Sequence, residues 1–150
     1  MIFREATIND IDNCKIVRMA VNENVLNDST LVTRADYVDY LSKHGKGWVC
    51  EIEKQIIGFS IVGLAERNVW ALFMLPKFEG KGIGGALHDL ALDWYFIQTS
   101  ETIWLGTEPK TKAETFYKRR GWTQVGIHRE AEIKMEMTAE SWSRRMEAGN

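Results

Sequence analysis

The stretch from Leu75 to Leu87 constrains this chain more than any other feature, and it reads Leu-Pro-Lys-Phe-Glu-Gly-Lys-Gly-Ile-Gly-Gly-Ala-Leu. Four of the chain's twelve glycines lie within six consecutive positions of it, between an apolar strand-like run (69–75) and an amphipathic helix-like run. A strand, a loop with few side chains and a helix start together form an anion cradle, because backbone N–H groups converge there and the helix dipole adds partial positive charge. The sequence therefore predicts a phosphate-bearing ligand at this loop.

Length and composition indicate one ordinary globular domain over residues 1–150. The net charge of −2 argues against a general nucleic-acid-binding protein, which carries a basic excess. No apolar stretch approaches the ~20 residues that cross a bilayer, and the first residues lack the charged start and apolar run of a signal peptide. We therefore expect a cytoplasmic protein with no nucleic-acid or membrane partner.

The cysteines and histidines show no pattern typical of a metal centre. Cys14 and Cys50 have neither metal-ligand nor redox-motif spacing, and both fall on apolar sides of their elements, so we expect buried free thiols. His44, His88 and His128 are scattered along the chain, and His88 is expected at the surface. The sequence therefore predicts no metal site.

Hydrophobic periodicity and capping signals predict, in order, a strand, two helices, three strands, a helix, a strand, a helix and two strands. Thr7 with Asp10 and Thr33 with Asp36 are capping pairs for the first two helices. The strand at 48–53 alternates apolar and polar residues, which predicts one wetter face, and Lys54-Gln55 separates it from the strand at 56–64 as in a hairpin.

The remaining elements surround the glycine loop. The strand at 69–75 is apolar throughout, which predicts burial on both faces. The helix after the loop has a predicted apolar stripe at Leu87, Leu90, Ala91, Trp94 and Ile97. A strand at 102–106, a capped helix ending at Gly121 and strands at 122–127 and 133–137 follow, and the tail is expected to be a frayed helix. The spacing of four tryptophans predicts that they face the core: Trp70, Trp94, Trp104 and Trp122.

Two other kinds of phosphate loop fit this stretch less well. Gly80, Gly82 and Gly85 satisfy the dinucleotide pattern G-x-G-x-x-G, and Glu108 stands about where a ribose-binding acid is sought. That turn needs the strand to run straight into the first glycine, whereas residues 76–79 intervene here, and too few residues follow for a full dinucleotide fold. A nucleoside-triphosphate loop is excluded because no Gly-Lys-Ser/Thr closes the glycines.

Two motifs and the element order resemble the GCN5-related N-acetyltransferase (GNAT) superfamily over essentially the whole chain. The family's phosphate loop, Gln/Arg-x-x-Gly-x-Gly/Ala, is similar to Glu79-Gly-Lys-Gly-Ile-Gly84. Its Ala-x-x-Phe-Tyr-x-x-x-Gly-Phe/Trp segment is similar to Ala113-Glu-Thr-Phe-Tyr-Lys-Arg-Arg-Gly-Trp122, about thirty residues on. The chain departs from the family at Glu79, where Gln or Arg is usual, and at Lys110, where the family often has an Asn that binds the pantetheine arm. We expect Glu79 to point outward.

The resemblance implies an α/β (α+β) fold: a mixed, mostly antiparallel sheet of six to seven strands, flanked by about four helices, with a central parallel pair splayed at the cofactor site. It also implies an acetyl-CoA-dependent N-acetyltransferase that moves an acetyl group to a primary amine of a small molecule or peptide, by direct attack in a ternary complex. The cofactor-binding positions carried over from the family are Phe73, Met74, Leu75, Glu79, Gly80, Lys81, Gly82, Ile83, Gly84, Gly85, Lys110, Ala113, Phe116 and Tyr117.

By the same resemblance, the backbone N–H near Met74 polarises the thioester carbonyl, and Tyr117 is the general acid that protonates the departing thiolate. The general base is open between Glu108, which follows the strand at 102–106, and Glu66, which precedes the strand at 69–75. An ordered chain of water molecules is the third option.

The acceptor is left open by the sequence. In this fold the loops around the cleft set it, here residues 22–33, where Glu23 and Asp28 hint at a cationic acceptor, and the turn near Glu130. The alternatives are a non-catalytic module that binds or senses acyl-CoA, transfer of another acyl group, and transfer to oxygen. Dimerisation is common in such folds, so a homodimer also stays open.

Overall fold

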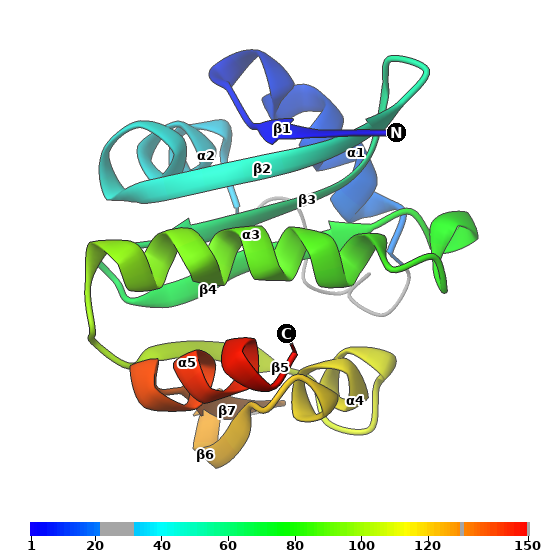
Figure 1. Cartoon of the computed structure of the whole chain (residues 1–150). Helices are drawn as coiled ribbons and strands as arrows, with labels where there is room; N and C mark the ends of the chain where they lie inside the picture. Colours follow the sequence, from blue (N-terminus) through cyan, green and yellow to red (C-terminus); the bar gives the residue numbers. More distant parts are fainter. Residues whose placement is uncertain (22–31, 130, 150) are drawn as a thin grey trace. The chain divides into compact units, whose positions relative to one another are not determined.

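The computed structural model describes residues 1–21, 32–129 and 131–149, and it contains seven strands and five α-helices there (Figure 1). The chain divides into two compact units, Met1–Tyr95 and Phe96–Asn150. Every strand pairing within either unit is antiparallel. The predicted α/β class, strand number and element order are confirmed, and the predicted four helices become five because the tail forms α5.

The first unit is built on four strands in the order β1-β2-β3-β4. They are β1 (Ile2–Glu5), β2 (Gly45–Ile52), β3 (Gln55–Gly63) and β4 (Asn68–Met74). The predicted hairpin between β2 and β3 is confirmed, with its turn one residue earlier than expected. Glu53 and Lys54 both have positive φ, 50° and 68°, as the tight turn of a two-residue hairpin requires.

Two helices cover one face of this sheet. They are α1 (Ile11–Met19), which follows the short turn η1 (Ile8–Asp10), and α2 (Arg34–Asp39), which continues into η3 (Tyr40–His44). Both predicted capping boxes are present. The helices and the sheet share one apolar core, made of Ile11, Cys14, Val17, Tyr37, Val49, Ile56, Phe59, Ile61 and Ala71.

Asp10 anchors the start of α1. Its carboxylate accepts hydrogen bonds from Arg4 Nη1 and Nη2, both at 2.9 Å, and from the Thr7 backbone N–H at 2.8 Å. The hydrogen bonds from Arg4 lower the pKa of this nearly buried carboxyl, against the opposing effect of burial. The position of α1 therefore depends on an ionised Asp10.

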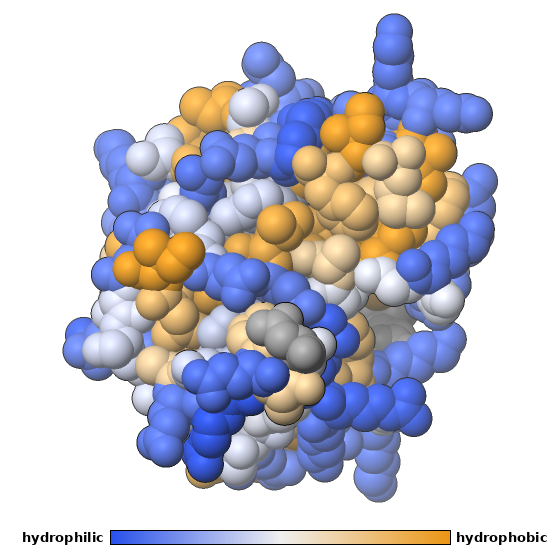
Figure 2. Space-filling model, viewed as in Figure 1, coloured by the Kyte–Doolittle hydropathy of each residue, from blue (hydrophilic) through white to orange (hydrophobic). Residues whose placement is uncertain are grey.

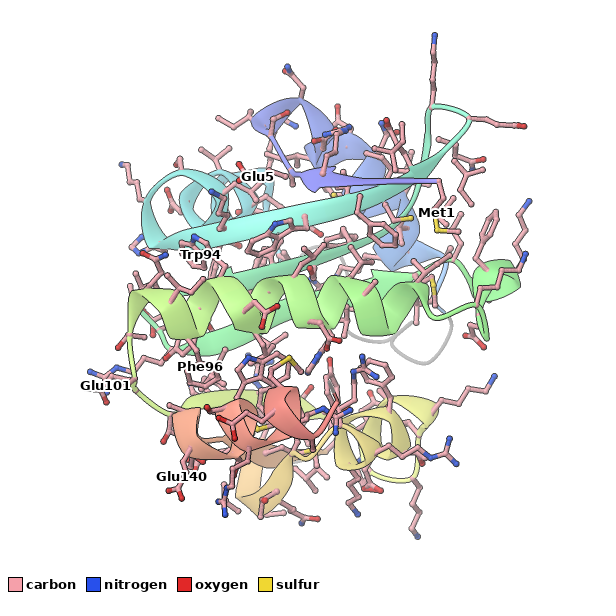
Figure 3. The ribbon with its side chains drawn as sticks, in the orientation of Figure 1. Met1, Glu5, Trp94, Phe96, Glu101 and Glu140 are labelled. Carbon is pink, nitrogen blue, oxygen red and sulfur yellow. The ribbon has the colours of Figure 1, made fainter. Side chains whose placement is uncertain are left out.

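The opposite face of the first unit's sheet packs against α3 (Ile83–Gln98), whose last residues, 96–98, belong to the second unit. Ser60 Oγ donates to the Leu87 carbonyl oxygen at 2.9 Å. Trp94 lies on α3 (Figure 3), and its ring centre is 6.0 Å from that of Trp48. Helices therefore cover both faces of β2. Val49 lies on the face of this strand that was predicted to be wetter, but it is fully buried, so the prediction is wrong there.

The buried side of α3 differs from the predicted stripe. Leu87 and Ala91 are buried as expected, but Leu90 is 36% exposed and Ile97 is 79% exposed. His88, expected at the surface, is only 1% exposed. The buried residues of the helix are Ile83, Gly85, Leu87, His88, Ala91, Leu92 and Tyr95. The prediction failed because it counted only apolar residues, whereas His and Tyr contribute large apolar surfaces with a polar tip.

The expected burial of β4 on both faces is also wrong. Only Asn68 and Ala71 are buried, and the other residues of the strand are half-buried. Trp70 is one of these, as are Trp94 on α3 and Trp104 on β5, so of the four tryptophans expected in the core only Trp122 is buried.

The second unit has three strands in the order β5-β7-β6: β5 (Ile103–Thr107), β7 (Glu132–Met137) and β6 (Thr123–Arg129). Its helices are α4 (Lys112–Arg119) and α5 (Ala139–Ala148), which Thr111 and Thr138 cap through their side-chain oxygens. The buried apolar residues of this unit are Ile103, Leu105, Tyr117, Trp122, Ile133, Met135, Met137 and Trp142.

Cys14 and Cys50 are buried free thiols, as predicted, and burial raises the pKa of the Cys14 thiol to about 12.

Figure 2 shows apolar surface near the N-terminus, where Met1 and Ile2 are more than half exposed. Within the described residues, no helix has the length and apolar character to cross a bilayer, and no cluster of three or more His, Cys, Asp or Glu side chains is suited to a metal ion.

Candidate functional site

The glycine loop connects β4 to α3 in the first unit. Pro76 ends the ladder pairing and opens the short helical turn η4 (Pro76–Phe78). Glu79 then leaves the turn in an extended conformation, and α3 begins at Ile83. Its first turn closes with the Ala86 N–H donating to the Gly82 carbonyl oxygen at 3.1 Å, which makes Gly82 the residue that caps the helix.

Two glycines of this loop need to be glycine for their backbone conformation. Gly80 has φ of 81° and Gly82 has φ of 79°, a left-handed region that other residues rarely adopt. A Cβ at either position would meet nothing within 4 Å, so open space lies beside both. Because Gly82 has no side chain, it offers no oxygen of its own to the N–H groups of the first turn of α3. The loop has the features of a phosphate cradle: open space, and backbone donors at a helix start.

The charges around the loop favour an anion. Lys77 and Lys81 are exposed, and their Nζ atoms lie 5.2 Å and 5.6 Å from the centre of the Phe78 ring. Glu79 is exposed, and its backbone N–H donates to the Pro76 carbonyl oxygen at 3.2 Å. Ile83 is 1% exposed, so its side chain is committed to packing and its backbone is what a ligand could reach.

At the end of β4, one backbone N–H points away from the neighbouring strand β3. The Leu75 N–H donates to the Ile57 carbonyl oxygen at 2.8 Å, and Phe73 is the register partner of Phe59. Successive N–H groups of a strand point to opposite edges. The Met74 N–H, between these two residues, therefore points to the edge of β4 that β3 does not occupy.

In the second unit, the motif around α4 forms a capped and tightly closed helix. The Glu114 N–H donates to Thr111 Oγ1 at 3.2 Å at its start. At its end, the Trp122 N–H donates to the Tyr117 carbonyl oxygen at 3.0 Å and the Gly121 N–H to Lys118 at 3.1 Å. This is the Schellman arrangement, and it requires the positive φ of 95° that Gly121 adopts.

Tyr117 is held by one aromatic neighbour on this helix and one just after it. Its ring lies 5.3 Å from Phe116 and 5.7 Å from Trp122, edge to face in both cases. The residue is buried, and burial raises the pKa of its hydroxyl above the ordinary value of 10.0. The hydroxyl is therefore protonated at neutral pH. Ala113 and Phe116 are half-buried on the same helix.

Lys110 lies just before the helix in a strained conformation. Its φ is 63°, in the left-handed region that Asn adopts more readily than Lys. The side chain is exposed. The backbone at Lys110 therefore favours Asn, the residue that is usual at this position in the family that the sequence resembles.

The two candidate bases occupy different surroundings. Glu108 follows β5, is half-buried, and its carbonyl oxygen accepts from Thr111 Oγ1 at 2.8 Å. Glu66 is exposed in the turn between β3 and β4. The length of β4 separates Glu66 from Met74 by roughly 20 Å, at about 3.3 Å per residue.

Most of the acceptor region predicted from the sequence lies outside the described residues, which omit 22–31 and 130. The sequence reasoning also missed one residue beside β4. The Arg18 guanidinium of α1 lies over the Phe73 ring, with Cζ 4.7 Å from the ring centre. Arg18 follows Ile11 and Cys14 at helical spacing, and this spacing of a charged residue on an apolar stripe is the signal that could have identified it.

A family model described as "Acetyltransferase (GNAT) domain" matches residues 43–124, which include the glycine loop and all of α4. The chain belongs to the GNAT acetyltransferase family. Its sequence has no significant match among curated proteins.

Solved structures share the fold of this GNAT chain at low sequence identity. The PaiA N-acetyltransferase from Thermoplasma acidophilum, in complex with coenzyme A, is 13% identical with a TM-score of 0.77, covering 91% of this chain and 98% of its own. The ribosomal-protein-S18-alanine N-acetyltransferase from Escherichia coli is 11% identical with a TM-score of 0.72, covering 92% and 93%. A protein proposed to be a streptothricin acetyltransferase, from Bacillus anthracis str. Ames in complex with acetyl coenzyme A, is 18% identical with a TM-score of 0.70, covering 91% and 98%.

Proposed function

We propose that this GNAT protein transfers the acetyl group of acetyl-CoA to a primary amine of a small molecule or peptide. The observation that carries the proposal is the open, left-handed glycine loop at the start of α3, inside the segment that matches the family model. Two proteins of the same fold have been crystallised with coenzyme A or acetyl coenzyme A, which supports the same cofactor here.

The backbone of the loop would hold the diphosphate of the cofactor. N–H groups between Gly80 and Gly85 are the donors, with Lys77 and Lys81 adding positive charge at the surface. The edge of β4 that faces away from β3, at Phe73, Met74 and Leu75, would pair with the amide groups of the pantetheine arm, as an added strand does. The other proposed cofactor-binding residues are Glu79, Ile83, Gly84, Lys110, Ala113, Phe116 and Tyr117.

Bound acetyl-CoA would supply an activated acetyl thioester to a deprotonated amine. The Met74 N–H, which points away from β3, would donate to the thioester carbonyl oxygen and stabilise the negative charge that develops on it. Loss of one such donor costs ~3 kcal/mol of transition-state stabilisation in other enzymes.

Tyr117 is the proposed general acid, and its hydroxyl would donate a proton to the sulfur of the leaving thiolate. A tyrosine hydroxyl, whose ordinary pKa is 10.0, carries its proton at neutral pH, and burial raises the pKa of Tyr117 further. An aromatic and apolar environment, with Phe116 and Trp122 in contact, also holds the ring in one orientation.

The amine must lose a proton before or during attack, because its ordinary pKa is about 10. Of the two proposed bases we favour Glu108, because the extended β4 strand places Glu66 about 20 Å from the Met74 N–H. Glu66 could act only through a chain of water molecules. Replacing each with Gln and measuring the pH dependence of turnover distinguishes them, since the true base shifts or removes the acidic limb of the profile.

The test of the proposed function is release of free thiol from acetyl-CoA in the presence of a panel of primary amines, with mass spectrometry of the products. We expect an amide product and intersecting initial-velocity lines, as direct attack in a ternary complex requires. Parallel lines would contradict direct attack. Tight binding of acetyl-CoA without thiol release on any amine would instead support an acyl-CoA-sensing module, and an ester product would indicate transfer to oxygen.

A further inference from the structure

We propose that the acceptor amine also carries a carboxylate, which Arg18 and Tyr37 bind on the helix-covered side of β4. This inference rests on the proposed function and adds the class of acceptor. All the residues that support it belong to the first unit, and they come from α1, α2, η3 and β4. We call Arg18, Tyr37, Tyr40, Trp70 and Phe73 the acceptor cluster.

Among the described residues, no carboxylate pairs with Arg18. Its Nη1 atom is shielded from solvent and makes no hydrogen bond within the described part of the chain, and no described carboxylate forms an ion pair with it. The guanidinium instead contacts aromatic rings, with Cζ 4.7 Å from the centre of Phe73 and 5.9 Å from the centre of Trp70. A guanidinium N–H shielded from water and left unpaired is costly, because burial removes its hydration. An anion at this position would remove that cost.

Tyr37 provides a second unpaired polar group in the same cluster. The residue is 1% exposed, and its hydroxyl makes no hydrogen bond of acceptable geometry among the residues that the structure describes. Burial raises the pKa of this hydroxyl, and the nearby Arg18 charge opposes the rise, which places the two groups in each other's field. A carboxylate could accept from the Tyr37 hydroxyl and from Arg18 together.

The aromatic members of the cluster form a surface against which an apolar acceptor could pack. The Trp70 ring stacks on Tyr40 with centres 4.3 Å apart, and it meets Tyr37 edge to face at 4.9 Å. Trp70 and Phe73 are only half-buried, so part of their surface is open. An acceptor with an aromatic or apolar body and one carboxylate matches these groups, as in an α-amino acid or the C-terminal end of a short peptide.

The cluster adjoins the backbone at which transfer is proposed. Phe73, whose ring carries the Arg18 guanidinium, immediately precedes Met74, whose N–H is the proposed oxyanion donor. A carboxylate held over Phe73 therefore positions the rest of the acceptor beside the reacting end of β4. A neutral amine of the same shape would lack this contact.

The test measures equilibrium binding rather than turnover, so it does not depend on acetyl transfer. L-phenylalanine, L-phenylalaninamide, L-leucine and L-leucinamide are titrated calorimetrically into the protein saturated with coenzyme A. We expect each carboxylate to bind about 10- to 100-fold more tightly than its amide, as a charge-assisted hydrogen-bonded pair allows. Arg18→Met should abolish this preference, and Tyr37→Phe should reduce it about threefold to tenfold.

The matched control is Arg34→Met, on α2. Arg34 is exposed and pairs with Asp12 at 2.9 Å, and its loss should leave the preference unchanged. Arg18→Met and Tyr37→Phe should both unfold in a cooperative thermal transition like that of the wild type, because each replacement keeps a side chain of similar size in the cluster.

A preference for carboxylates that persists in Arg18→Met, or no preference in the wild type, would overturn the proposal. Carboxylate binding that depends on Arg18 without any thiol release would support the site and refute acetyl transfer. Thiol release with amines but no carboxylate preference would leave the proposed function standing and overturn this inference alone.

Discussion

The glycine loop and the acceptor cluster are both proposed to bind anions, but the chain builds them in opposite ways. In the loop, consecutive residues between Gly80 and Gly85 are proposed to offer backbone N–H groups, and side chains must be absent at Gly80 and Gly82. In the cluster, single side chains from α1, α2 and β4 converge, and each must be present. The loop should therefore be sensitive to any added side chain, whereas the cluster should be sensitive to removal of its polar groups.

The largest effect is expected when a side chain is added to the loop. Gly82→Glu forces a side chain into a left-handed position and brings a negative charge to the cradle. We expect acetyl-CoA to bind about 1,000-fold more weakly, since several charge-assisted hydrogen bonds are lost together. Isothermal titration measures this. Gly126→Glu is the control, because it adds the same charge at open space on β6 without positive φ; equal losses in both variants would contradict the backbone cradle.

Tyr117→Phe tests the proposed general acid, which is a side chain of the second unit. We expect turnover to fall about 100-fold while the affinity for acetyl-CoA changes less than about twofold, because only a proton donor is removed. Thiol release and titration calorimetry give the two quantities. Tyr95→Phe, which removes the hydroxyl of another buried tyrosine, is the control. Wild-type turnover in Tyr117→Phe would exclude Tyr117 from the mechanism.

Asp10→Asn tests the support of the helix that holds Arg18. Removing the ion pair with Arg4 should destabilise the protein by about 1–2 kcal/mol in chemical unfolding at neutral pH and leave acetyl-CoA binding intact. The pKa of Asp10 is lowered in the folded state, so its contribution is present above the unfolded value of 3.8 and is lost as the pH falls below it. The stability difference between wild type and variant should therefore shrink toward acid pH. A difference that is independent of pH would contradict the assigned ion pair.

Lys110→Asn should give the smallest effect, and it tests strain rather than binding. Asn tolerates the φ of 63° at this position better than Lys, so we expect a gain of about 0.5–1 kcal/mol in unfolding free energy. Urea denaturation measures the gain. Lys112→Asn, two residues later at the first position of α4, is the control and should not stabilise the protein. A loss of stability in Lys110→Asn would show that the lysine side chain contributes more than the backbone strain costs.

The same difference between the glycine loop and the acceptor cluster determined what could be predicted from the sequence. The loop and the closing turn at Gly121 were predictable because the need for glycine is local and the spacing of the motif is visible in the chain. The acceptor cluster was not, because Arg18, Tyr37 and Phe73 are brought together only by packing. Its one visible signal, a charge at helical spacing from Ile11 and Cys14, has no meaning until the facing strand is known.

The errors in burial have the same origin. Val49 was expected on a wetter face because its strand alternates, but α1 and α2 cover that face. His88 was expected at the surface because it is polar, yet it is buried on α3. Periodicity indicates which residues share a face, whereas the structure shows whether another element covers it.

The most direct test of the central claim compares two thioesters that differ in the part the glycine loop is proposed to bind. Acetyl-CoA carries a diphosphate, and S-acetylpantetheine lacks it. If backbone N–H groups between Gly80 and Gly85 hold that diphosphate, acetyl-CoA should bind the wild-type protein at least about 100-fold more tightly, and Gly82→Glu should remove most of the difference. Equal affinity of the wild-type protein for both thioesters would contradict the account.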